Sequence, residues 1–127
     1  MKDKGIIYDK SLAFAIRMVN LKEYLFSRHE NIIAKQILRS GTSIGANYSE
    51  ALGAESTTDF IHKMKISLKE IYETQYWLDV LLKTNYLDET QYSSLASDTD
   101  ELIKLFTSSI NTSLKKLQPT ENFQISE

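Results

Sequence analysis

Few side chains in this sequence are suited to catalysis or to metal binding. The two histidines, His29 and His62, lie far apart in the chain, and neither belongs to a Glu-x-x-His or His-x-x-x-His pattern. A di-iron helical bundle needs two Glu-x-x-His motifs. The sequence also lacks cysteine, a Gly-x-Ser-x-Gly nucleophile motif, a phosphate-binding P-loop and a dinucleotide-binding fingerprint. We therefore predict a protein that is not an enzyme and that has no catalytic residue, metal site or cofactor.

Contact with phosphate groups is a second kind of chemistry that the sequence could support. Basic and then aromatic side chains recur along one expected helix face: His62, Lys65, Lys69, Tyr72 and Tyr76. Such a row can grip a nucleic-acid backbone and stack on its bases. The three basic residues and Arg39 are therefore candidate nucleic-acid contacts. The alternative is an ordinary solvated face, because Lys69 can pair with Glu73 one turn away.

A polar row lies in the segment 38–52, LRSGTSIGANYSEAL, which is rich in small residues. Projected at about 100° per residue, one side of the expected helix carries Arg39, Ser43, Asn47 and Glu50. This row fits a hydrogen-bonded seam between helices or subunits, or a surface that binds a ligand. We expect the seam.

Two glycines, Gly41 and Gly45, lie one turn apart in the same segment. A glycine inside a helix costs about 1 kcal/mol relative to alanine, so a compensating contact is expected. We predict close packing of a neighbouring helix against both glycines. A turn at 40–43 that breaks the helix is the alternative, but the apolar spacing keeps its phase on both sides of Gly41.

Apolar spacing predicts four helices, at about residues 10–28, 32–52, 57–84 and 89–117. Capping patterns at Ser56 and Asp88 mark the starts of the third and fourth helices. The short connections predict one all-α domain, residues 1–117, folded as an antiparallel up-down-up-down four-helix bundle. Pro119 ends the last helix, and we expect residues 118–127 to form a disordered tail.

The expected helices carry more apolar surface than one bundle needs. In the first helix, Leu12, Ile16, Val19 and Phe26 adjoin the main apolar face, so the apolar arc covers about half of the helix. This surplus predicts contact with another molecule, although deep packing within one bundle is an alternative. On the back of the third helix, Ile66 and Trp77 point the same way and form a candidate subunit interface.

Composition limits the remaining possibilities. The chain has 127 residues, 42% of them hydrophobic, and 15 basic against 17 acidic residues give a formal charge of -2. This balance is not typical of a generic nucleic-acid binder, although local basic patches remain compatible with it. The N-terminal residues lack the apolar core of a signal peptide, and no stretch approaches about 18 apolar residues. We expect a cytoplasmic protein with no membrane partner and no small-molecule substrate.

The small-residue segment also carries a family resemblance. The pattern Arg-Ser-x-x-Ser-Ile-x-x-Asn-x-x-Glu over residues 39–50, with Asp59-Phe60 and the segments 67–70 and 73–75, resembles the bacterial four-helix-bundle family known as 23S rRNA intervening-sequence proteins. The resemblance spans roughly residues 10 to 115. This sequence has Ala51-Leu52-Gly53 where a glycine often follows the glutamate directly.

The resemblance implies a four-helix bundle that assembles into a ring, a homopentamer, without an established enzymatic activity. It also implies a distant similarity to the accessory protein of diversity-generating retroelements, a basic pentamer that binds nucleic acid and a reverse transcriptase. We therefore expect an oligomeric assembly or adaptor protein, whose partners are its own copies and RNA or another protein. The alternative is an RNA-binding protein associated with ribosomal RNA or its fragments.

Overall fold

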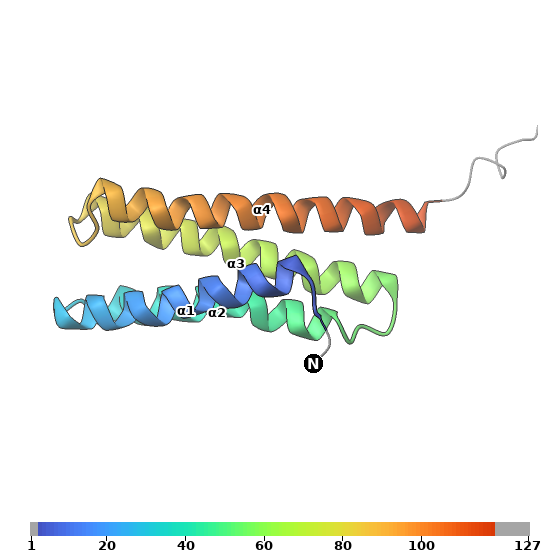
Figure 1. Ribbon diagram of the computed structural model, residues 1–127, viewed down its shortest axis with the longest axis horizontal. Coiled ribbons are helices and arrows are strands. Elements are labelled where there is room, and N and C mark those ends of the chain that lie inside the picture. The colour runs from blue at the N-terminus through green and yellow to red at the C-terminus, as the bar shows by residue number, and fades with distance from the viewer. Residues whose placement is uncertain (1–2, 119–127) are drawn as a thin grey trace, which may run out of the picture.

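Four long helices make up the part of the chain that the computed structural model describes, residues 3–118. They are α1 (Ile6–Ser27), α2 (Ile32–Ala51), α3 (Thr57–Lys83) and α4 (Glu89–Leu117). Consecutive helices run in opposite directions and lie alongside one another (Figure 1). The described residues contain no β-strand. The predicted all-α, antiparallel up-down-up-down four-helix bundle is therefore confirmed.

The ends of the helices show where local signals and tertiary packing decide the boundary. Helix α1 begins at Ile6 and not near residue 10, because Ile7 and Tyr8 pack against the hydrophobic core and extend the helix. The expected caps form at the starts of α3 and α4. Ser56 accepts a hydrogen bond from the Asp59 amide, and Asp88 forms a capping box with Gln91. The predicted disordered tail lies outside the described residues, apart from Gln118.

The core is continuous along the bundle, but some pairs of helices pack more closely than others. Helix α2 packs closely against α1 and α3, and α3 packs closely against α4. Helices α1 and α4 are joined by polar contacts at their surface, where Arg17 bonds to Asp98 at 2.6 Å and Lys10 pairs with Glu101 at 3.3 Å. Inside, the ring of Tyr48 meets the edge of Phe106 with centroids 5.8 Å apart.

Helix α2 runs without interruption through both of its glycines, so the alternative of a turn at 40–43 is wrong. A Cβ atom added at Gly41 would overlap the Cγ atom of Met18 in α1. A Cβ atom at Gly45 would lie 3.2 Å from the Cβ atom of Ser11, also in α1. The missing side chains therefore allow α1 to approach the backbone of α2.

Within residues 3–118, no helix has the length and apolar character needed to cross a lipid bilayer.

Replacement of Gly41 by alanine tests this close approach. The substitution should gain about 1 kcal/mol of helix propensity, but overpacking against Met18 costs about 1–3 kcal/mol. We expect Gly41→Ala to lower the free energy of unfolding by up to about 2 kcal/mol in urea denaturation. Gly53→Ala is the control, because its Cβ atom would meet only the Glu50 carbonyl oxygen, at 3.7 Å. A Gly41→Ala protein more stable than the wild type would contradict the packing argument.

Candidate functional site

The two histidines do not form a common site. His29 lies in the turn between α1 and α2, where it adopts a positive φ of 64°, and His62 is exposed in the second turn of α3. These positions are at opposite ends of the bundle (Figure 1). Among residues 3–118, no cluster of three or more histidine or carboxylate side chains could hold a metal ion.

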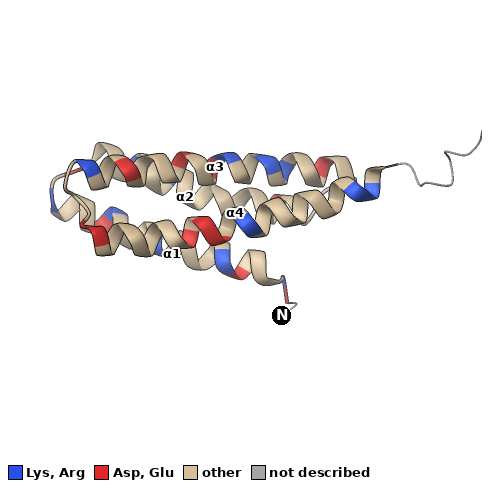
Figure 2. Ribbon diagram, turned by 90° about the horizontal axis from the view of Figure 1, so that it is seen from above, with Lys and Arg blue, Asp and Glu red and all other residues tan. Residues whose placement is uncertain are grey.

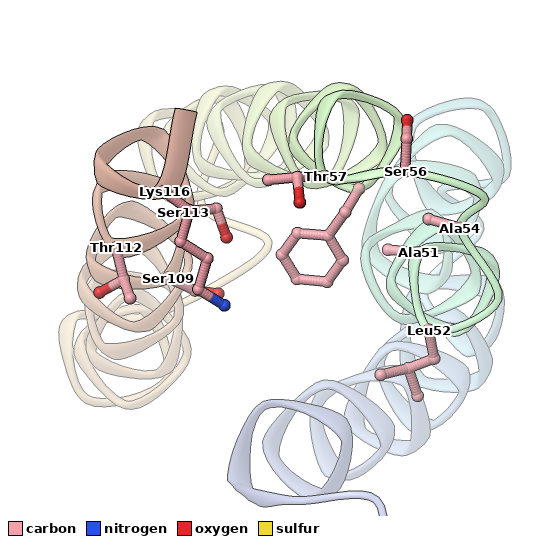
Figure 3. Close-up of a pocket in the computed structure, with 10 residues that line it drawn as sticks. Ala51, Leu52, Ala54, Ser56, Thr57, Ser109, Thr112, Ser113 and Lys116 are labelled. Atoms are coloured by element: carbon pink, nitrogen blue, oxygen red, sulfur yellow. The ribbon is translucent and has the colours of Figure 1, made fainter. Parts of the chain in front are cut away.

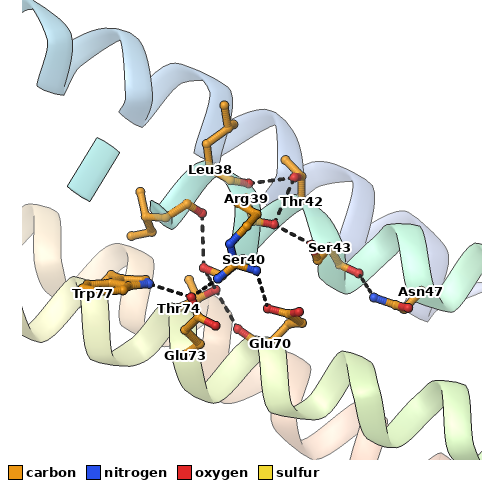
Figure 4. A network of polar contacts seen from close by, with 11 residues as sticks. Leu38, Arg39, Ser40, Thr42, Ser43, Asn47, Glu70, Glu73, Thr74 and Trp77 are labelled. Carbon is orange, nitrogen blue, oxygen red and sulfur yellow. Dashed lines mark hydrogen bonds and ion pairs between the residues drawn. The ribbon is translucent and has the colours of Figure 1, made fainter. Parts of the chain in front are cut away.

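The polar row of α2 begins with Arg39, which reaches across to α3 (Figure 4). One guanidinium nitrogen donates to Glu70 at 3.3 Å, and another donates to Glu73. Glu73 also accepts a hydrogen bond of 2.9 Å from the indole nitrogen of Trp77. Arg39, its two partners Glu70 and Glu73, and Trp77 therefore form one charged, hydrogen-bonded cluster.

The rest of the row bonds partly to its own helix and partly to α3. Ser43 donates to the Arg39 carbonyl oxygen at 2.6 Å, and Asn47 donates to the Ser43 carbonyl oxygen at 2.9 Å. At the far end, Lys63 of α3 pairs with Glu50 at 2.7 Å. The two charged ends of the row thus bridge α2 to α3, which places the row in a seam between helices of one chain.

Buried hydroxyl groups continue this seam beneath the charged surface. Thr74 donates to the Oγ atom of Ser40 at 2.8 Å, and Ser67 donates to the Ile44 carbonyl oxygen at 2.9 Å. All three hydroxyl-bearing residues are buried. Because each contact satisfies a polar group inside the core, these hydrogen bonds offset the cost of burying the hydroxyl groups and help to fix how α2 and α3 sit against each other.

Electrostatics favour the charged forms of the Arg39 and Glu73 side chains. The hydrogen bond from Trp77 is the largest cause that lowers the pKa of Glu73, and the hydrogen bond and charge of Arg39 add to it against the opposing effect of burial. The hydrogen bond to Glu73 in turn raises the pKa of Arg39 above its ordinary value. This cluster is therefore an ion pair and offers no group poised to move a proton near neutral pH.

The candidate interface residues Ile66 and Trp77 are both half-buried on α3. Trp77 packs against the core, and its ring meets the edge of the Tyr76 ring with centroids 5.3 Å apart. Ile66 is not part of the core cluster. The two side chains thus lie on the rim of α3 that faces α2, and each keeps some exposed surface.

The basic row of α3 is exposed along its whole length. His62, Lys65 and Lys69 all face solvent, and Tyr72 and Tyr76 beyond them are 52% and 61% exposed. The possible pair between Lys69 and Glu73 is not formed, and Arg39 and Trp77 both bind the Oε2 atom of Glu73.

Arg39 differs from the other three candidate nucleic-acid contacts, His62, Lys65 and Lys69, because carboxylates of α3 bind its side chain. Its guanidinium group is held by Glu70 and Glu73 on the α2–α3 seam. Lys65 and Lys69 form no ion pair with any other residue of the described range.

The fold leaves an apolar face on α1 uncovered. Leu12, Ile16 and Val19 recur at helical spacing and remain 48%, 54% and 46% exposed. Beside them, a groove of about 180 Å³ separates α1 from α2. Small residues line the α2 side of this groove: Thr42, Gly45, Ala46 and Ser49. The sequence predicted the surplus of apolar surface on α1 and the small residues of α2, whereas the groove between them depends on how the two helices pack.

A hollow of about 500 Å³ lies at the end of the bundle where α2 is joined to α3 and α4 ends (Figure 3). Phe60 and small apolar residues form one side. Hydroxyl groups and one ammonium group line the rest: Ser56, Thr57, Ser109, Thr112, Ser113 and Lys116. Sequence reasoning missed this hollow, because its residues come from three separate segments. Its lining has no carboxylate or imidazole group that could act as a general base.

These features define a helical bundle whose notable surfaces are a polar seam, an apolar face and a basic row. Residues 3–108 match the family model of the 23S rRNA-intervening sequence protein, and the chain belongs to that family. No curated protein matches the sequence.

A solved structure is similar over most of its length. It is the crystal structure of a protein with unknown function from the S23 ribosomal protein family of Bacteroides thetaiotaomicron. It is 51% identical to this chain, with a TM-score of 0.82, and the match covers 83% of this chain and 98% of that one. The predicted family is therefore confirmed, and the comparison gives no activity.

The cluster around Glu73 predicts a specific response to acid. Because the pKa of Glu73 is lower in the folded state, its contribution to stability is complete above its ordinary pKa of 4.5 and is lost as the pH falls through the folded value. We expect Glu73→Gln to be less stable than the wild type at neutral pH, with a difference that shrinks toward about pH 3 in urea titrations.

Trp77→Phe is the matched variant, since it removes the indole N–H but keeps an aromatic ring. It should weaken the same acid dependence to a smaller extent, because Arg39 still holds Glu73. An acid dependence in Glu73→Gln equal to that of the wild type would show that this pair does not stabilise the seam.

Proposed function

We propose that this protein is a non-enzymatic assembly or adaptor protein that associates with copies of itself. The uncovered apolar face on α1 carries the proposal: Leu12, Ile16 and Val19 present one continuous row to solvent. A monomeric protein rarely leaves such a row uncovered, and rows of this kind mark contacts with other proteins. A second copy is the occupant that we propose.

The groove beside the row supports an interlocking contact. Small side chains on α2, including Gly45 and Ala46, leave a depression next to the projecting side chains of α1. A face that combines ridges and holes suits helix-to-helix packing by knobs-into-holes contacts. The half-buried Ile66 and Trp77 on the rim of α3 are the surface that we propose for the neighbouring copy.

Such a contact joins two different surfaces and is therefore heterologous. Heterologous contacts produce a closed ring when a whole number of identical rotations from one copy to the next completes a full turn. A ring of five copies is the state that the family resemblance implies, and we propose it here. Burying the exposed halves of three aliphatic side chains gives about 3 kcal/mol. That gain is below the cost of association, so the groove and the α3 rim must contribute as well.

RNA association is the second candidate function, and the basic row of α3 supports it. Lys65 and Lys69 are exposed and free of ion pairs with residues 3–118, so both charges are available to a polyanion. Under this proposal the protein associates with ribosomal RNA or its fragments. The row lies on a different helix from the α1 face, but it adjoins the α3 rim, where Trp77 contacts Tyr76.

Charge placed in the apolar face tests self-assembly. We expect Ile16→Glu to reduce the molar mass measured by light scattering from that of an oligomer to that of a monomer, because a carboxylate would be desolvated at the contact. Ile66→Ser should reduce the oligomer less completely. Ile32→Glu is the control, since Ile32 is an exposed isoleucine at the start of α2, away from the row.

Circular dichroism should show that all three variants keep their helices. A wild-type protein that is monomeric at micromolar concentration would rule out the proposed assembly. An oligomer that survives Ile16→Glu would place its contact elsewhere.

A further inference from the structure

We propose that α3 and α4 together form a binding surface for the phosphate backbone of single-stranded nucleic acid. The surface consists of Lys65 and Lys69 on α3 and Lys104 and Lys115 on α4, and we call it the cationic surface. The inference rests on the second candidate function. It adds a second helix to the site and specifies the chemistry of the ligand.

Charge is segregated along α4, and α3 has a shorter acid-free stretch between Asp59 and Glu70. Residues 60–69 of α3 contain three lysines and a histidine but no aspartate or glutamate. Residues 102–117 of α4 likewise contain three lysines and no acidic residue, whereas every acidic residue of α4 lies within 89–101. The net charge of -2 for the whole chain therefore conceals a local excess of positive charge.

The antiparallel packing of α3 and α4 brings the two acid-free segments side by side. Gln75 donates to Thr99 at 3.1 Å, which sets the register of the two helices. Further along, Phe60 lines the same hollow as Ser109 and Ser113. Lysines of both segments consequently gather over the same half of the helix pair, while acidic residues predominate on α4 toward the other end (Figure 2).

The four lysines of the cationic surface are exposed, and none forms an ion pair with another residue of the described range. Of the carboxylates one turn before Lys104, Glu101 pairs with Lys10, and Asp100 accepts a hydrogen bond from Gln75. Glu70 and Glu73 bind Arg39 on the α2 side of α3, and Glu50 binds Lys63. The cationic surface therefore keeps its charge and can release counterions when a polyanion binds.

Polar side chains join the two lysines of α4. Thr107, Ser108, Asn111 and Thr112 share one hollow with Lys104 and Lys115. Their hydroxyl and amide groups can donate hydrogen bonds to phosphate oxygens between the two charges. Lys65 and Lys69 are one helical turn, about 6 Å, apart, which suits a ligand with regularly repeated charges.

Aromatic side chains at the edge of the cationic surface favour a nucleic acid over an acidic protein. Tyr72 and Tyr76 follow Lys65 and Lys69 on the same face of α3, and both rings are more than half exposed. Exposed rings beside a basic track can stack on unpaired bases, each contributing to affinity without sequence preference. This combination fits a single strand.

Fluorescence anisotropy with a labelled single-stranded RNA of mixed sequence tests the proposal on the full chain. The α3 variant is Lys65→Ala with Lys69→Ala, and the α4 variant is Lys104→Ala with Lys115→Ala. Each should weaken binding about tenfold at low salt and reduce the slope of log K against log salt by about 1.4, or about 0.7 per lost phosphate contact. Lys4→Ala with Lys35→Ala is the matched control, which removes two exposed lysines outside α3 and α4 and should leave the slope unchanged.

The outcomes separate the cationic surface from the candidate function on which it rests. Absence of wild-type binding at low salt would overturn both. Binding weakened by the α3 variant but not by the α4 variant would retain RNA association and overturn the two-helix surface. An equal loss in the control would show diffuse charge attraction and would also overturn it.

Two further binding measurements test the chemistry of the ligand. Single-stranded DNA of the same sequence is expected to bind comparably, which supports recognition through phosphates, and binding of RNA alone would contradict it. Tyr72→Ala should weaken binding several-fold. Undiminished binding by Tyr72→Ala, together with equal competition by polyglutamate, would indicate an acidic protein as the partner and overturn the proposal.

Discussion

The close approach of α2 to both of its neighbours is the constraint on which the rest of the molecule depends. On one side, Gly41 leaves room for Met18 of α1. On the other side, the buried hydroxyl of Ser40 accepts a hydrogen bond from Thr74 of α3. Small side chains thus replace the usual large ones at both contacts. This arrangement holds α1 against α2 and leaves Ile16 and its apolar neighbours on the outside.

The same packing divides the charges of the molecule. Arg39 on α2 draws Glu70 and Glu73 toward the α2–α3 seam, and Lys63 is paired with Glu50 on that side. The opposite side of α3 keeps its lysines and has no acidic partner for them among the described residues. A seam that stabilises the bundle therefore also leaves a surface of one sign, which the near-neutral composition of the chain does not reveal.

Sequence patterns predicted much of this fold, because helix periodicity, the caps at Ser56 and Asp88 and the short loops are local signals. They failed where distant segments decide the outcome. The start of α1 depends on Tyr8 reaching the core, and the partner of Glu73 is an arginine from another helix and not Lys69. The groove between α1 and α2, the hollow at the end of the bundle and the cationic surface all require the register between helices, which periodicity alone does not supply.

The central claim is that the apolar face of α1 is buried between copies of the chain. The chain has no cysteine, so Val19→Cys would carry the only thiol. The most direct test is the rate at which this thiol reacts with a soluble reagent over a range of protein concentrations, compared with Ile32→Cys. The account predicts slow reaction at high concentration and faster reaction on dilution for Val19→Cys. Equally fast reaction of both thiols at every concentration would contradict it.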